Sequence, residues 1–246
     1  RYVPVKDMGF MIECPDYLQF QEDAFLLCSP QGLAKRVDNK QNVYDTGYYK
    51  VRQQDLIDYE ALDYGFDFYA PQTFYNEERN IMIAWIGMPD NAYVDRFDTW
   101  NQTLTMPRSL SFDKRILQKP IQEILDLRTD KQIHTHDFVI PKSCNIECDV
   151  NSDFSLQLNA ITMTYKQHTF TLDLSACNCR RQQRCIHGIE LHQISIFVDE
   201  SVLESFIKEG ADTMTARFYD DEQALHVASR EIKHYVTYNM RGFQIL

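Results

Sequence analysis

The chain has 246 residues, of which 44% are apolar, enough to fill the core of one large all-β unit or of two ordinary domains. Its 36 acidic residues outnumber its 25 basic residues, and the net charge of −11 would repel a nucleic-acid backbone or an anionic membrane leaflet over most of the surface. The longest apolar run, residues 81–88, has only the length of a strand. The sequence therefore argues against nucleic-acid and membrane partners.

Short runs rich in aromatic and β-branched residues recur along the chain and predict an all-β protein. Turn-forming residues separate these runs at 14–16, 29–32, 89–91 and 220–221. Only residues 121–127, after Pro120, predict a helix. The predicted strands are residues 10–12, 24–28, 44–51, 66–69, 81–86, 154–158, 169–174, 194–198, 203–207 and 213–218.

The short helix indicates a boundary between two units. We expect one domain over residues 1–112, a connector over 113–128 and a second domain over 129–246. The second unit has the strand density of a β-sandwich. The first has room for only about eight strands, too few to close a β-propeller by itself.

Seven cysteines form an odd set without the regular spacing of a secreted disulfide framework, which favours reduced thiols and a cytoplasmic protein. Cys177, Cys179, Cys185 and His187 offer metal-binding side chains. They lack paired Cys-x-x-Cys knuckles and lie beside several arginines, so a cysteine-rich surface loop is the favoured interpretation. We expect no metal and no other cofactor.

Glu13 ends an apolar strand just before the turn predicted at Cys14-Pro15-Asp16. Partial burial at such a position disfavours the charged form of a carboxyl group, which suits it to deliver a proton to a leaving group. Cys14 is either a weak donor that adjusts this environment or a small buried filler. The residue types alone leave both alternatives open.

Residues 62–74 combine two carboxylates with several aromatic rings. Carboxylates accept hydrogen bonds from the hydroxyls of a sugar, and ring faces cover its apolar C–H patches. The segment therefore indicates sugar binding. An aromatic core strand flanked by solvated acids explains the same pattern.

Four segments of the chain recur together as a set: Glu13-Cys14-Pro15-Asp16 and residues 63–74, 79–85 and 104–108. Their order and spacing are those of glycoside hydrolase family 32, the invertase and sucrose-6-phosphate hydrolase family, which the chain resembles over nearly its whole length. Residues 194–206 and the following Gly210 resemble the late hairpin of that family's C-terminal sandwich.

The resemblance implies about the last two blades of a five-bladed β-propeller followed by a β-sandwich, in an enzyme that hydrolyses terminal β-fructofuranosyl bonds with retention. Glu13 and Asp63 occupy matched positions in the family's motifs. The resemblance therefore implies that Glu13 is the general acid/base and that Asp63 binds sugar at the pocket rim. Tyr69 and Trp85 are candidate pocket aromatics, although such residues in strands more often belong to a core.

The family's Asn-Asp-Pro segment, which carries the nucleophile, and its Arg-Asp-Pro segment do not occur in this sequence. They are expected upstream of residue 1. Retaining hydrolysis needs two carboxyl groups, so the chain is expected to be inactive alone and to have its own N-terminal fragment as a partner.

The expected substrate is a small sugar, with sucrose 6-phosphate favoured by the acidic composition and the thiols, and with sucrose or a short fructan left open. The alternative from another functional class is a non-catalytic fragment that binds carbohydrate or mediates association.

Overall fold

The computed structural model describes residues 8–35, 41–53, 55–89, 91, 102–177 and 181–243. Over these residues the protein is all-β, as the sequence predicted, with twenty strands, one short α-helix and one 3₁₀ turn. All paired strands within its four sheets run antiparallel. In the same part of the chain, no helix has the length and apolar character needed to cross a membrane.

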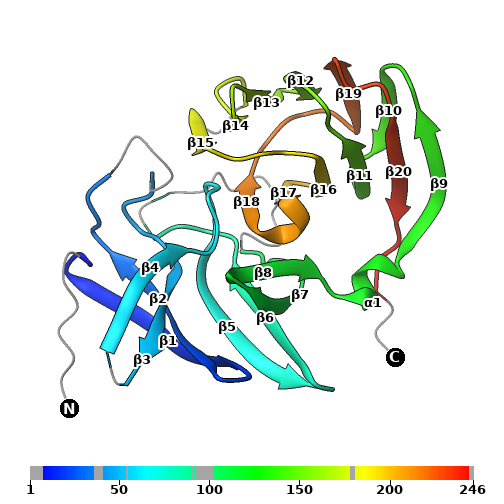
Figure 1. Cartoon of the computed structure of the whole chain (residues 1–246). Coiled ribbons are helices and arrows are strands. Elements are labelled where there is room, and N and C mark those ends of the chain that lie inside the picture. Colours follow the sequence, from blue (N-terminus) through cyan, green and yellow to red (C-terminus); the bar gives the residue numbers. More distant parts are fainter. Residues whose placement is uncertain are drawn as a thin grey trace.

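Two four-stranded sheets form the first part of the chain, and each is a meander in sequence order, as in a propeller blade (Figure 1). A shared core that includes Leu18, Phe25 and Met82 lies between them. The first sheet contains β1 (Met11–Phe20), β2 (Asp23–Gln31), β3 (Gly47–Arg52) and β4 (Asp55–Ala61). The second contains β5 (Tyr69–Asn76), β6 (Arg79–Trp85), β7 (Arg108–Asp113) and β8 (Arg115–Pro120).

Two six-stranded sheets form the rest and enclose the largest core, because alternate residues of their strands point inward. On β13, for example, Ile161, Met163 and Tyr165 are buried. One sheet has the order β18-β17-β16-β11-β20-β9 and the other the order β10-β19-β12-β13-β14-β15. The bounds are β9 Arg128–His134, β10 Phe138–Pro141, β11 Cys144–Asp149, β12 Phe154–Leu158, β13 Ile161–Lys166, β14 Thr169–Asp173, β15 Gln183–His187, β16 Gln193–Asp199, β17 Val202–Ile207, β18 Asp212–Arg217, β19 Ala224–Arg230 and β20 Tyr235–Met240. The 3₁₀ turn is Lys208–Gly210.

The structure differs from the predicted elements at several places. Residues 29–31 of the turn predicted at 29–32 belong to β2, and residues 66–68 of the strand predicted at 66–69 precede β5. Residues 115–120, which the sequence assigned to the connector, form β8 and pair with β7, so only the short helix α1 (Gln122–Leu125) and its flanks join the two parts. The turn predicted at 14–16 is wrong, because β1 continues through it to Phe20. The assignment of the two parts as domains stays a prediction.

A fully buried guanidinium, that of Arg108, joins the second sheet to the six-stranded sheet that contains β17 and β18. Its Nη2 donates to Glu204 at 2.6 Å and to Thr215 at 2.7 Å, and its Nη1 donates to Gln118 at 2.8 Å. The same Nη1 lies 3.5 Å from a carboxylate oxygen of Asp63. Since this group has exchanged all its water for protein partners, the contact between the two parts depends on it.

Replacing this guanidinium should destabilise the chain strongly. Arg108→Met keeps the volume but leaves the Asp63 and Glu204 carboxylates buried without their cation, which should lower the free energy of unfolding by about 3–5 kcal/mol. As the control, Arg79→Met removes an ion pair with Glu123 at the surface and should change the free energy of unfolding little. Urea unfolding of both variants measures the difference, and equal midpoints would contradict the assigned role.

Candidate active site

Glu13 lies in β1 directly before a β-bulge. Glu13 pairs with Ser29 and Asp16 pairs with Leu27, so Cys14 and Pro15 together oppose one residue of β2. Cys14 adopts a left-handed conformation, with φ of 49°, and Pro15, which has no N–H, occupies a position where the ladder requires none. The bulge is thus the physical reason why a proline is accepted inside this strand.

Two donors fix one oxygen of the half-buried Glu13 side chain. The Gln31 amide donates to Oε2 at 2.6 Å, and the Tyr69 hydroxyl donates to the same oxygen at 3.1 Å. Burial raises the pKa of the Tyr69 phenol, so Tyr69 remains protonated and can donate. Both donors are on Oε2, and the other carboxylate oxygen accepts no hydrogen bond from the residues that the structure describes.

A second bulge of the same kind places Tyr69. In the pairing of β5 with β6, Tyr69 opposes Trp85 and Gln72 opposes Ile83, so two residues again stand against one. Ala70 has φ of 51°, matching Cys14, and a proline follows it as well. Each bulge lies near the start of the first strand of its sheet, and β1 and β5 lie in contact (Figure 1).

The structure brings three of the four predicted site residues together. Glu13 contacts Tyr69, whose ring lies edge-on to that of Trp85 with a centroid distance of 6.4 Å. Trp85 is partly exposed, and its indole N–H donates to Gln102 at 2.7 Å. The ring of Tyr44 also lies 6.4 Å from the Tyr69 ring. Tyr69 thus connects Glu13 to two further aromatic rings, a combination that suits a sugar site.

Asp63 does not join this group. Only 4% of the residue is exposed, and its carboxylate accepts hydrogen bonds from Thr213, from both the amide and the hydroxyl of Thr215, and from the amide of Gly65. These contacts place it beside Arg108 in the interior and not at a pocket rim. A desolvated aspartate with this many partners holds the two parts of the chain together.

The cysteine cluster gives no sign of a metal site in the described part of the chain, where no three His, Cys, Asp or Glu side chains are gathered as ligands. Cys179 and the adjacent Arg180 lie outside the described residues.

Sequence reasoning missed Gln31 and Tyr44, whose positions depend on strand pairing. Gln31 is the diagonal neighbour of Glu13 on the adjacent strand, two residues beyond its partner Ser29. Such neighbours share a sheet face. The sequence could identify Gln31 as a neighbour of Glu13 only if the register of β1 and β2 were already known.

The fold and site define an all-β protein that has propeller-like sheets and a carboxylate placed by a β-bulge near aromatic residues. Residues 3–120 match the family described as glycosyl hydrolases family 32 N-terminal domain, and residues 96–240 match glycosyl hydrolases family 32 C terminal. The chain belongs to glycoside hydrolase family 32.

Curated relatives and solved structures agree with this membership. The sucrose-6-phosphate hydrolase of Vibrio alginolyticus is 33% identical over 88% of this chain and 50% of its own length, and that of Staphylococcus xylosus is 31% identical over 89% and 51%. The chain thus spans about half the length of the curated relatives it matches. The β-fructofuranosidase structure from Bombyx mori is 27% identical with a TM-score of 0.82, over 96% of this chain and 55% of that one.

Cys14 offers a probe of the neighbouring charge. Burial raises the pKa of its thiol, and the Glu13 carboxylate raises that pKa further. Glu13→Gln should lower the Cys14 pKa and speed its alkylation, by less than about tenfold because burial, the larger cause, remains. Peptide-resolved iodoacetamide labelling at pH 8 measures this, with Cys185 as the internal control. An unchanged Cys14 rate would contradict the effect of the Glu13 charge on this thiol.

Proposed function

We propose that this chain supplies the general acid/base, Glu13, of a retaining glycosidase that cleaves terminal β-fructofuranosyl bonds. The observation that supports this most is the geometry of one carboxylate: Gln31 and Tyr69 hold a single oxygen, and the other accepts no hydrogen bond from the described residues. Membership of the family adds the reaction class.

In the proposed reaction, protonated Glu13 gives its proton to the glycosidic oxygen while a second carboxylate attacks the anomeric carbon of the fructosyl unit. The carbon–oxygen bond to the leaving sugar breaks and a covalent fructosyl-enzyme forms. Glu13, now ionised, takes a proton from water as the water oxygen attacks the anomeric carbon. The bond between this carbon and the second carboxylate breaks, which releases fructose with its configuration retained. Tyr69 and Trp85 line the sugar site in this proposal.

The second carboxylate is proposed to come from polypeptide outside these 246 residues, because the family's Asn-Asp-Pro segment does not occur in them. The first sheet supports an additional neighbour. It has apolar side chains on both faces, in the core shared with the second sheet and in a small cluster around Cys28 and Tyr49. At the edge formed by β1, Phe10, Met11 and Tyr17 are 47–72% exposed. We therefore propose that the two four-stranded sheets are the last two blades of a five-bladed propeller, followed by a β-sandwich.

The proposed substrate is sucrose 6-phosphate or sucrose. The first follows the names of the bacterial relatives, and the second follows a variant of the Bombyx mori enzyme solved in complex with sucrose. The cytoplasmic location predicted from the thiol-rich composition belongs to the same proposal.

The decisive substitution is Glu13→Gln in the enzyme that contains both carboxylate segments. It removes the transferable proton while the amide oxygen still accepts from Gln31 and Tyr69, so folding should persist and kcat on sucrose should fall by about 10²–10⁴-fold. Glu22→Gln, an exposed change at the turn between β1 and β2, is the control. Stopped assays of released fructose measure both, and a near-normal kcat for Glu13→Gln would refute the assignment.

Tyr69→Phe tests how the acid is held. Loss of one hydroxyl that donates to a charged group should lower kcat by about tenfold, because the Glu13 side chain loses one of two directional contacts. Tyr75→Phe removes an exposed hydroxyl from the same strand and should leave kcat unchanged. Indistinguishable rates for the two variants would show that Tyr69 does not position Glu13.

A further inference from the structure

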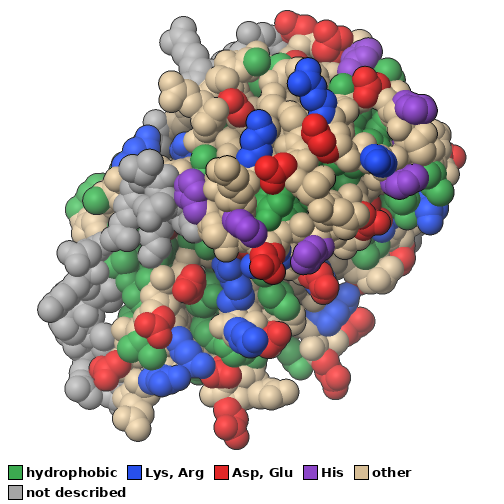
Figure 2. Space-filling model, turned by 45° about the horizontal axis from the view of Figure 1, so that its top comes forward, with side chains coloured by type: hydrophobic (Ala, Val, Ile, Leu, Met, Phe, Trp, Pro, Cys, Tyr) green, Lys and Arg blue, Asp and Glu red, His purple; other side chains and the backbone are tan. Residues whose placement is uncertain are grey.

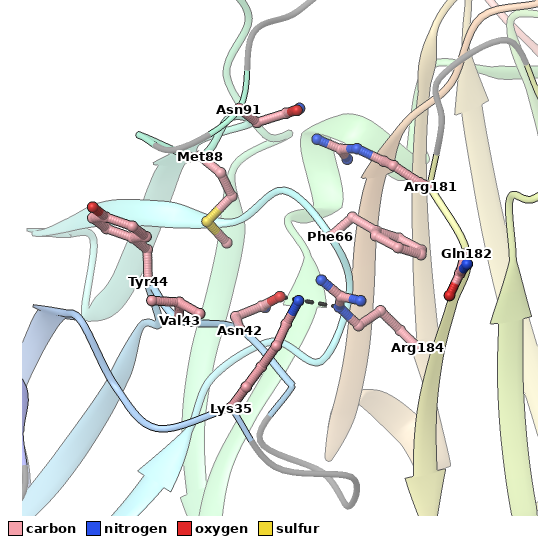
Figure 3. A pocket seen from close by; sticks show the side chains of 10 residues that line it. All are labelled: Lys35, Asn42, Val43, Tyr44, Phe66, Met88, Asn91, Arg181, Gln182 and Arg184. Atoms are coloured by element: carbon pink, nitrogen blue, oxygen red, sulfur yellow. Dashed lines mark hydrogen bonds between the residues drawn. The ribbon is translucent and has the colours of Figure 1, made fainter.

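A cavity of about 310 Å³ lies between the segment that precedes β3 and the start of β15 (Figure 3). Its walls come from parts of the chain that are about 140 residues apart in sequence, as the contact between Asn42 and Arg184 shows. This volume is at the lower end of the range for small-molecule sites. The lining residues are Lys35, Asn42, Val43, Tyr44, Phe66, Met88, Asn91, Arg181, Gln182 and Arg184.

The lining is positively charged in a chain with a net charge of −11. Three of its residues are cationic, and none of the described lining residues is acidic. A second cavity, beside Lys142, shows the opposite character and is lined by Glu200, Asp220, Asp221 and Glu222. On the face in Figure 2, described acidic and basic side chains are interspersed. The charge of the first cavity is therefore local and does not reflect the composition of the chain.

Neighbouring groups hold the two arginines in place. Arg181 forms an ion pair with the buried Asp67. Arg184 donates from Nε to Asn42 at 3.0 Å, and its guanidinium carbon lies 4.4 Å from the centre of the Phe66 ring. Figure 3 shows both side chains on one wall with Phe66 between them, and Lys35 on the facing wall. Lys35 is exposed and has no carboxylate partner in the described part of the chain.

One ring connects this cavity to the candidate acid. Tyr44 lines the cavity, pairs through its backbone with Gln31, and packs against the ring of Tyr69. Gln31 and Tyr69 are the two residues that hold Glu13. A ligand in the cavity would therefore lie next to the groups that place the acid.

We propose that this cavity binds the phosphate of a phosphorylated sugar, with Lys35, Arg181 and Arg184 as the recognising cations. A phosphate monoester carries a charge of about −1.5 to −2 at pH 7, and guanidinium groups match its oxygens with paired N–H donors. Phe66, Met88 and Tyr44 offer apolar surface to the attached sugar. The inference rests on the proposed function, since it makes the cavity the part of that site that selects a phosphorylated substrate.

Binding to the 246-residue chain tests the cavity without any turnover. Calorimetric titration at fixed ionic strength should show binding of glucose 6-phosphate but not of glucose, and competition by inorganic phosphate. Lys35→Glu should weaken binding at least about tenfold and Lys35→Gln less, since charged hydrogen bonds are among the stronger ones. Lys233→Glu makes the same charge change at another exposed lysine and should have no effect. Equal effects of Lys35→Glu and Lys233→Glu would overturn the proposal.

Kinetics in the enzyme that contains both carboxylate segments test the specificity. The ratio of kcat/KM for sucrose 6-phosphate to that for sucrose should fall at least about tenfold in Lys35→Glu and stay constant in Lys233→Glu. Turnover with an unchanged ratio overturns the inference while the proposed function stands. No turnover of either sugar, with Lys35-dependent binding of glucose 6-phosphate retained, rejects the proposed function and supports the phosphate site.

Discussion

The buried contact between Arg108, Asp63 and Glu204 is the constraint on which the candidate site depends. Asp63 binds Thr213 and Thr215 of β18, and four residues later Asp67 accepts from the backbone N–H of Arg217 on the same strand. The segment that leads into β5 is therefore clamped at two points. Since Tyr69 is the first residue of that strand, the buried charges fix the hydroxyl that holds Glu13.

Directional polar contacts fix the position of this segment against β18 better than apolar packing would. Removing charged groups from water costs several kcal/mol per ion, and a well-packed apolar contact would stabilise the same interface at least as well. An apolar contact, however, lets two surfaces slide over one another. The guanidinium of Arg108 permits one arrangement, because its donors must meet the oxygens of Glu204, Gln118 and Thr215 together.

The sequence predicted the all-β fold and the family, because alternating strands and short motifs are local signals. It did not predict the bulges: a proline after a strand normally marks a turn, and only the pairing of Asp16 with Leu27 shows that β1 continues. The family resemblance placed Asp63 at a sugar site, and the acids and aromatics of residues 62–74 have a composition that fits one. The actual partners of Asp63, Thr213 and Thr215, lie about 150 residues further along the chain. Local composition cannot distinguish buried partners from a ligand.

In the proposed function, the same long-range folding separates the acid from the groups that would select the substrate. Glu13 and its two donors come entirely from the first two sheets, whereas two of the three cations that line the cavity come from the segment at the start of β15. Under this proposal, a change at Arg184 or Lys35 would alter the charge that a substrate meets without altering the carboxylate that would protonate it. Because the net charge of the chain opposes the approach of anions, we propose that the few cations lining this cavity determine whether a phosphorylated sugar is accepted.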